Sequence, residues 1–273
     1  MNVFSPDNCS DTDIKVLQIS DMHLFASKEQ QLVGVNTEES FLLVLELAQQ
    51  ASWPPDLIFL TGDLSQDGSE ASYTRLIKHL SSFNIPCFVL PGNHDTPEKL
   101  NHTFNTGSVL YQPIVHHKQW LFAFLDSETP GSEGGTLKDA EISQLRKAIE
   151  HNPEKQVLIC LHHQLIPVGS KWLDSMAVAN PDSLLELIRE HKNIAGIIHG
   201  HVHQDFEGSV EGRPIYATPS TCFQFTAKSE DFAIDNIAPG YRWLRLSSNG
   251  AIETNVIRLD SAPDNLERSS AGY

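Results

Sequence analysis

Clusters of histidine, aspartate and asparagine follow five apolar segments of this chain, each at the point where the segment ends. The clusters are Asp21-Met22-His23, Gly62-Asp63, Gly92-Asn93-His94-Asp95, His162-His163 and His199-Gly200-His201-Val202-His203. Aspartate and histidine together suit borderline divalent cations such as Mn, Fe, Zn or Co, whereas a calcium site would be nearly all oxygen. An asparagine adds a neutral oxygen ligand, and one aspartate with two oxygens can bridge two ions. The residue types therefore predict a metal site.

Each cluster also has a simpler structural explanation when it is taken alone. An Asp-x-His sequence occurs often by chance, and Gly62-Asp63 is ordinary turn chemistry. The segment 92–95 could be only a tight turn after a buried strand. Two histidines at 201 and 203, directly after a strand, favour metal binding more strongly. The specificity of the prediction comes from all five clusters in this order.

The apolar segments have the length of buried strands and alternate with amphipathic segments. Strands are expected at 14–19, 57–60, 87–90, 120–125, 157–161 and 194–198, and helices at 38–50, 70–83, 138–150 and 182–190. Asn36 before the first helix and Asn180 before Pro181 are expected to cap the helices that follow them. Ligands of α/β sheets bind beyond the carboxyl ends of the strands, so we expect the five clusters to converge there.

The order of the elements predicts a layered α/β architecture. A βα-rich first part and a strand-rich end favour two packed sheets with helices outside them over a simple doubly wound sheet. A length of 273 residues with 40% hydrophobic content is enough for one large core. We expect an N-terminal tail over 1–13, one catalytic domain over 14–260 and a polar C-terminal tail over 261–273.

The charge of the chain limits its partners. Lys and Arg number 19 against 35 Asp and Glu, a formal net charge of −16. This charge works against a nucleic acid or an anionic membrane surface as partner. A small anionic substrate would be repelled as well, unless the site itself carries positive charge.

The cysteines and the N-terminal residues bear on location. The start of the chain has no basic and apolar pattern of a signal peptide, and no apolar run is long enough to span a membrane. Cys9, Cys87, Cys160 and Cys222 are widely spaced, which is typical of reduced thiols rather than a disulfide framework. We therefore expect a cytoplasmic protein.

The ordered set of clusters resembles the calcineurin-like metallophosphoesterase superfamily. The chain is further similar to the bacterial class III 3′,5′-cyclic-AMP phosphodiesterases at residues 20–25, 34–37, 62–67, 217–222 and 237–240. The resemblance implies a four-layer αββα sandwich of two packed mixed sheets flanked by helices. It also implies two divalent metal ions, Fe and/or Mn. The sequence leaves a monomer and a homodimer equally open. The implied reaction is hydrolysis of cyclic AMP to 5′-AMP by a hydroxide shared between the metals, which would lower intracellular cyclic AMP.

The family pattern, carried onto this chain, implies a role for each matching residue. One metal ion would be held by Asp21, His23, Asp63 and His203, and the other by Asp63, Asn93, His162 and His201. Asp63 would bridge the two ions. His94 matches the non-ligand histidine beside the leaving group and is the expected catalytic acid. Contacts with the substrate are expected from His23, Asp63, Asn93, His94 and His203.

Two positions depart from the patterns of related proteins. Many relatives follow the histidine at 162 with His-Pro-Pro, whereas here the proline is delayed to Pro167, so His163 is an alternative ligand to His162. Gln66 stands where protein phosphatases have an aspartate that orients the leaving-group histidine. Asp67 and Asp95 are therefore the candidates for orienting His94.

Two other functions remain open on the sequence. A related enzyme that acts on another phosphodiester, a nucleotide-sugar pyrophosphate or a phosphomonoester would use the same ligands. A metal-binding interaction module without catalysis would be expected to show gaps in the ligand set, and this chain has none.

Overall fold

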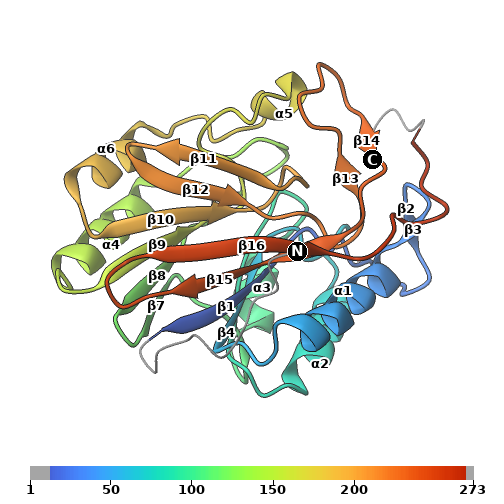
Figure 1. Ribbon diagram of the computed structural model, residues 1–273, viewed down its shortest axis with the longest axis horizontal. Coiled ribbons are helices and arrows are strands. Elements are labelled where there is room, and N and C mark those ends of the chain that lie inside the picture. Colours follow the sequence, from blue (N-terminus) through green and yellow to red (C-terminus); the bar gives the residue numbers. More distant parts are fainter. Residues whose placement is uncertain (1–12, 269–273) are drawn as a thin grey trace.

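The computed structural model describes residues 13–268, and in that range two six-stranded sheets pack face to face (Figure 1). The first sheet has the order β16-β15-β1-β4-β5-β6 and consists of β1 (Ile14–Ile19), β4 (Leu57–Thr61), β5 (Cys87–Leu90), β6 (Val109–Tyr111), β15 (Gly240–Leu246) and β16 (Ile252–Arg258). The second has the order β11-β12-β10-β9-β8-β7 and consists of β7 (Ile114–His117), β8 (Trp120–Phe124), β9 (Gln156–Cys160), β10 (Ile194–His199), β11 (Phe206–Val210) and β12 (Arg213–Ala217).

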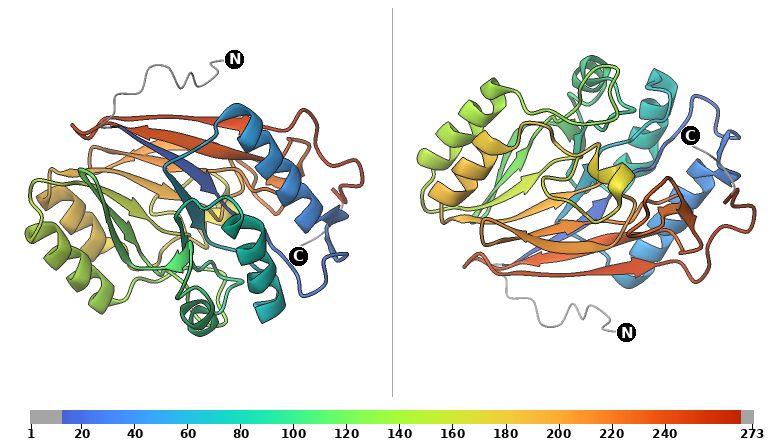
Figure 2. Two further views of the ribbon diagram at one scale, coloured as in Figure 1. Left: turned by 90° about the horizontal axis from the view of Figure 1, so that it is seen from below. Right: turned by 90° about the horizontal axis from the view of Figure 1, so that it is seen from above.

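Helices cover the outer face of each sheet, as the two views of Figure 2 show. The first sheet is covered by α1 (Thr37–Ala51), α2 (Glu70–Ser81) and α3 (Pro97–Thr103), and the second by α4 (Asp139–Glu150) and α6 (Asp182–Glu190). The smaller elements are α5 (Lys171–Asp174) and the hairpins β2 (Gln31–Leu32) with β3 (Val35–Asn36) and β13 (Gln224–Phe225) with β14 (Ile234–Asp235). The predicted four-layer αββα sandwich is confirmed.

The alternation of side chains along the strands creates these layers. On β4, Leu57 and Phe59 belong to the apolar cluster between the two sheets, while Ile58 and Leu60 belong to the cluster under α1 and α2. β9 alternates in the same way between the sheet interface and the cluster under α4 and α6. Successive side chains of a strand point to opposite faces, so a strand that is apolar throughout can be buried on both sides.

The strands that precede the predicted site are parallel, which brings their ends together. In the first sheet β1 pairs with β4 and β4 with β5, and in the second β9 pairs with β10, all parallel. Their carboxyl ends therefore lie along one edge of the sandwich. β15 runs antiparallel to β1 and extends the first sheet on its far side.

One of the two helix-cap predictions is confirmed and the other is wrong. The Asn36 side chain accepts a hydrogen bond from the Glu39 N–H at 3.1 Å, as expected of an N-cap. Asn180 does not cap α6, because Pro181 occupies the N-cap position and no side-chain bond is made there. Asn180 instead accepts from Leu137 N–H and donates to Leu137 O, both at 2.8 Å. Two bonds that satisfy both ends of the amide outweigh the single bond of a cap.

The predicted tails and cysteines fall partly outside the described residues. Of the N-terminal tail only Asp13 is described, and Cys9 lies outside the described range. Cys87, Cys160 and Cys222 are buried free thiols, as expected. Within the predicted C-terminal tail, Leu266 packs against a buried apolar cluster near β2 and β3. Between residues 13 and 268, no helix has the length and apolar character needed to cross a membrane.

The centre of the sheet interface gives the first testable prediction. Phe59 is fully buried there and meets Phe122 and Phe124 edge to face at ring-centroid distances of 4.9 and 5.0 Å. Phe59→Ala leaves a cavity between two sheets that cannot close, so we expect the free energy of unfolding to fall by about 3–5 kcal/mol. Urea unfolding in the presence of a chelator measures this without a contribution from bound metal.

The matched control is Leu43→Ala on α1, where the side chain is 52% exposed. We expect this substitution to change the free energy of unfolding by no more than about 0.5 kcal/mol. Equal effects of the two substitutions would contradict the placement of Phe59 in a closely packed core between the sheets.

Candidate metal centre

The five predicted clusters converge beyond the carboxyl ends of β1, β4, β5, β9 and β10. Asp63 Oδ2 lies 3.7 Å from His23 Nε2 and 3.4 Å from His162 Nε2. Asp21 Oδ1 lies 3.4 Å from His203 Nε2. Residues separated by up to about 180 positions thus meet through direct side-chain contacts. The convergence that the sequence predicts is present.

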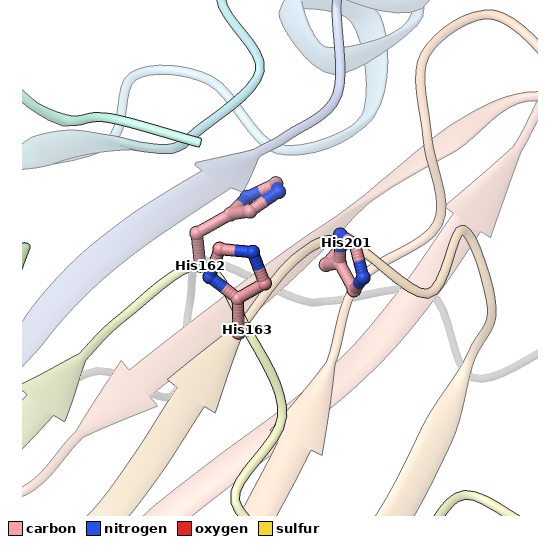
Figure 3. A group of neighbouring side chains, drawn as sticks. All are labelled: His162, His163 and His201. Carbon is pink, nitrogen blue, oxygen red and sulfur yellow. The ribbon is translucent and has the colours of Figure 1, made fainter. Parts of the chain in front are cut away.

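The remaining predicted residues join the same centre. Asn93 Oδ1 lies 3.2 Å from His162 Nε2. His201 donates its backbone N–H to both oxygens of Asp21, at 3.1 and 3.2 Å. Figure 3 shows its ring beside those of His162 and His163, with centroids 5.1 and 4.6 Å away. Each predicted cluster therefore contributes to one centre.

The backbone at these residues adopts an uncommon conformation. Positive φ angles occur at Asp21 (56°), His23 (47°), Asp63 (48°), His201 (66°) and His203 (47°). For residues with a Cβ this conformation costs on the order of 1 kcal/mol each, and it is concentrated at functional sites. Local hydrogen bonds hold it, such as that from His23 N–H to Asp63 O at 2.9 Å. The turn re-aims each side chain toward the centre directly after its strand.

Two glycines of the motifs are required by close packing. A Cβ at Gly92 would lie 2.1 Å from Asp63 Oδ1, and a Cβ at Gly62 would lie 2.3 Å from His162 Nδ1. Real Cβ atoms do not approach other atoms so closely. The glycines therefore allow the loops after β4, β5 and β9 to meet at the centre.

Three of the histidines are fixed in one tautomer. The Nδ1 atoms of His23, His162 and His203 each face an oxygen that only accepts hydrogen bonds. These acceptors are Gln66 Oε1 at 2.6 Å, Thr61 O at 2.8 Å and Phe223 O at 2.9 Å. In a neutral ring the proton must then sit on Nδ1, so Nε2 presents a lone pair to the centre.

This arrangement fits a cation. When both rings are neutral, His23 Nε2 and His203 Nε2 present lone pairs to each other at 3.2 Å, beside the buried carboxylates of Asp21 and Asp63. His201 Nε2 is also buried, and no described residue donates to it or accepts from it. Buried acceptors and negative charges facing one another are costly unless positive charge lies among them. Carboxylate, imidazole and amide oxygen are a donor set for borderline divalent metals.

The pKa values of His162 and Asp63 reflect the strong interaction between the charges of the centre. Burial by itself would lower the pKa of His162, but the Asp63 carboxylate outweighs it and raises the pKa to about 9. Burial would raise the pKa of Asp63, yet His162 and His94 hold it well below its ordinary value. A proton on His162 and a metal cation are alternative occupants of the position between these two side chains.

His163 differs from His162 in its partners. His163 Nδ1 lies 2.8 Å from Ser127 Oγ, and Nε2 lies 3.1 Å from Glu133 O. A neutral ring that donates from Nε2 and accepts at Nδ1 satisfies both, and burial lowers the pKa of His163 to about 3. Although His162, His163 and His201 are close enough to share an ion, His163 already has a protein partner at each nitrogen.

The two candidates for orienting His94, Asp95 and Asp67, both accept hydrogen bonds from backbone N–H groups. Asp95 accepts from the N–H groups of Gly92, Leu64 and Ser65 at 2.9 to 3.0 Å, and from the Tyr73 hydroxyl at 3.0 Å. It thereby ties the loop after β4 to the loop after β5, and burial raises its pKa to about 7. Asp67 accepts from Ala26 N–H at 2.8 Å.

His94 itself lies at the partly exposed side of the centre. Its backbone N–H donates to Asp63 Oδ1 at 3.0 Å, and its ring meets the ring of His23 edge to face at 5.2 Å. The imidazole is therefore beside the ligand cluster and reachable from solvent.

Comparison with known proteins agrees with the fold and the site. Residues 14–205 match the calcineurin-like phosphoesterase family. The chain is 37% identical to the 3′,5′-cyclic adenosine monophosphate phosphodiesterase CpdA of Pseudomonas aeruginosa over 100% of both chains. It is also 37% identical to the protein of the same name from Escherichia coli over 95% of each chain.

Solved structures share the architecture at low identity. A dimetal phosphatase from Danio rerio has a TM-score of 0.59 and 14% identity, covering 90% of this chain and 98% of that one. A purple acid phosphatase from yellow lupin has a TM-score of 0.56 and 14% identity, covering 91% and 54%. This protein belongs to the calcineurin-like phosphoesterase family, and it is a hydrolase of that class.

The close packing at Gly92 yields a prediction about metal binding. Gly92→Ala places a methyl group against the Asp63 carboxylate and backbone, so we expect the protein to fold but to retain clearly less metal after gel filtration. Elemental analysis and circular dichroism measure the two properties. Gly134→Ala is the control, because its Cβ would meet nothing closer than 3.4 Å. Full metal content in Gly92→Ala would contradict the packing argument.

Proposed function

We propose that the protein hydrolyses 3′,5′-cyclic AMP to 5′-AMP with two divalent metal ions. One observation carries the proposal. A complete set of donor side chains converges in a chain that resembles curated cyclic-AMP phosphodiesterases from end to end. A module that had lost catalysis would be expected to lack some of these donors.

The ligand assignment follows the contacts of Asp63. In our proposal Asp21, His23, Asp63 and His203 hold one ion, and Asp63, Asn93, His162 and His201 hold the other. Asp63 Oδ2 lies within 3.7 Å of His23 Nε2 and 3.4 Å of His162 Nε2, which belong to different ions. This supports Asp63 as the bridging residue. His162 rather than His163 is the ligand, because both nitrogens of His163 are engaged with Ser127 and Glu133.

In the proposed reaction, the metals and the side chains of the protein have different roles. The metal pair, when bound, would supply a hydroxide nucleophile at neutral pH and positive charge for the phosphate oxygens. The phosphate would lie among His23, Asp63, Asn93, His94 and His203. Asn93 contributes a neutral dipole, so it adds no negative charge to repel the substrate.

His94 is the proposed acid. Its ring lies beside that of His23, and its backbone is anchored to Asp63. From this position the imidazolium form would steady the phosphoryl oxygens and give its proton to the departing ribose 3′-oxygen. A positioned acid of this kind typically contributes about 10²- to 10⁴-fold in rate.

Metal identity and location complete the proposal. We assign Fe and/or Mn to the site, since mixed carboxylate and imidazole ligands accept both and the family resemblance favours them. A cytoplasmic location is supported by the free thiols of Cys87, Cys160 and Cys222. On a chain with a net charge of −16, metals are also the source of positive charge that an anionic nucleotide requires.

His94→Ala tests the acid. We expect the variant to keep its metal content and to lose about 10²- to 10⁴-fold in kcat for cyclic AMP. His102→Ala, which removes an exposed histidine from nearby α3, should leave kcat unchanged. A His94→Ala variant with a rate near that of the wild type would show that the acid is elsewhere.

A substrate panel tests the choice of nucleotide. The panel contains cyclic AMP, cyclic GMP, a 2′,3′-cyclic nucleotide, an aryl phosphodiester, a nucleotide sugar and a phosphomonoester. We expect cyclic AMP to have the highest kcat/KM, and we expect activity to disappear with a chelator and return with Mn²⁺. Slow hydrolysis of cyclic AMP beside a fast alternative would replace the proposed substrate while leaving the enzyme class intact.

A further inference from the structure

Gln66 contacts His23 on the side of the ring that faces away from the proposed metal centre. Gln66 Oε1 lies 2.6 Å from His23 Nδ1, and the His23 ring is buried while Gln66 is partly exposed. Nε2 of the same ring faces Asp63 Oδ2 at 3.7 Å. The amide oxygen accepts the Nδ1 proton, so it fixes both the tautomer and the rotation of the ring.

The backbone around Gln66 is held directly against the loop that carries His23. Gln66 N–H donates to Leu24 O at 2.9 Å, and Leu24 N–H donates to Leu64 O at 3.1 Å. Asp67 adds a further hydrogen bond between the two loops, because it accepts from Ala26 N–H at 2.8 Å. These bonds hold the backbone of residue 66 against the loop that carries His23, so the Gln66 side chain starts from a fixed position beside the imidazole.

The neutrality of the amide matters as much as its position. Asp21 and Asp63 already place two carboxylates in the buried centre. A carboxylate at residue 66 would accept the same proton more strongly, and it would also add a third negative charge beside an anionic substrate. A neutral amide orients the ring and does not repel the anionic substrate.

We propose that Gln66 is a positioning residue that holds His23 toward the metal centre through an uncharged acceptor and so supports metal affinity and anionic-substrate binding together. The proposal rests on the function proposed above, in that His23 is taken as a metal ligand. Hydrogen-bonded partners of ligating histidines typically contribute about 10- to 100-fold in metal affinity.

The experiment compares Gln66→Ala, Gln66→Glu and the control Gln30→Ala, which removes an exposed glutamine from the nearby loop. Mn²⁺ affinity is measured on the full-length protein by chelator competition from the Mn²⁺-loaded state. We expect Gln66→Ala to bind Mn²⁺ about 10- to 100-fold more weakly than the wild type, with thermal unfolding in EDTA unchanged. Gln30→Ala should match the wild type in both measurements.

Gln66→Glu separates orientation from charge. We expect it to retain Mn²⁺ at least as tightly as the wild type and to raise KM for cyclic AMP, with the rise in KM shrinking as salt is added. Wild-type Mn²⁺ affinity in Gln66→Ala, or an unchanged KM in Gln66→Glu, would overturn the proposal. If the wild-type protein instead fails to hydrolyse cyclic AMP while Gln66→Ala still weakens Mn²⁺ binding, the role of Gln66 stands and the proposed substrate is wrong.

Discussion

Buried carboxylates and imidazole nitrogens that crowd together at one edge of the sandwich are the constraint on which the rest of this structure depends. The Nε2 atoms of His23 and His203 lie 3.2 Å apart beside two buried carboxylates, Asp21 and Asp63. In the protein alone the buried charge is costly because it is removed from solvent, and protons on neighbouring histidines such as His162 offset it. Metal cations bound there would replace these protons. Binding of metal would then be coupled to the stability of this edge of the fold.

The fold supplies the rigidity that such a site requires. Parallel strands from both sheets end at the same edge, and left-handed turns directly after them re-aim the ligands. Asp95 binds three backbone N–H groups across two loops, which keeps Asp63 and Asn93 in register. In our proposal, the neutral side chain of Gln66 orients one ligand without adding to the negative charge of the centre. The hydrogen bonds at Nδ1 of His23, His162 and His203 lie on the side of each ring away from the proposed metals.

The sequence predicts most of the residues that converge at the candidate metal centre and less of what surrounds them. The clusters are visible because polar metal ligands stand directly after apolar strands, a pattern that a core does not produce by chance. The hydrogen bonds that orient His162 and His203 cannot be predicted from the sequence. Their acceptors are the backbone carbonyls of Thr61 and Phe223, which any residue type could provide. The predicted cap at Asn180 is wrong because the partner of this side chain, Leu137, is distant in sequence and cannot be identified from it.

Metal content per chain tests the central claim most directly. The wild-type protein, loaded with Mn²⁺ and passed through gel filtration, should hold about two ions per chain by elemental analysis. Asp63→Ala, with an unchanged circular dichroism spectrum, should hold fewer than about one, because the removed carboxylate is shared by both ions. If Asp63→Ala retains two tightly bound ions, the buried carboxylate is not the bridge and the proposed centre is wrong.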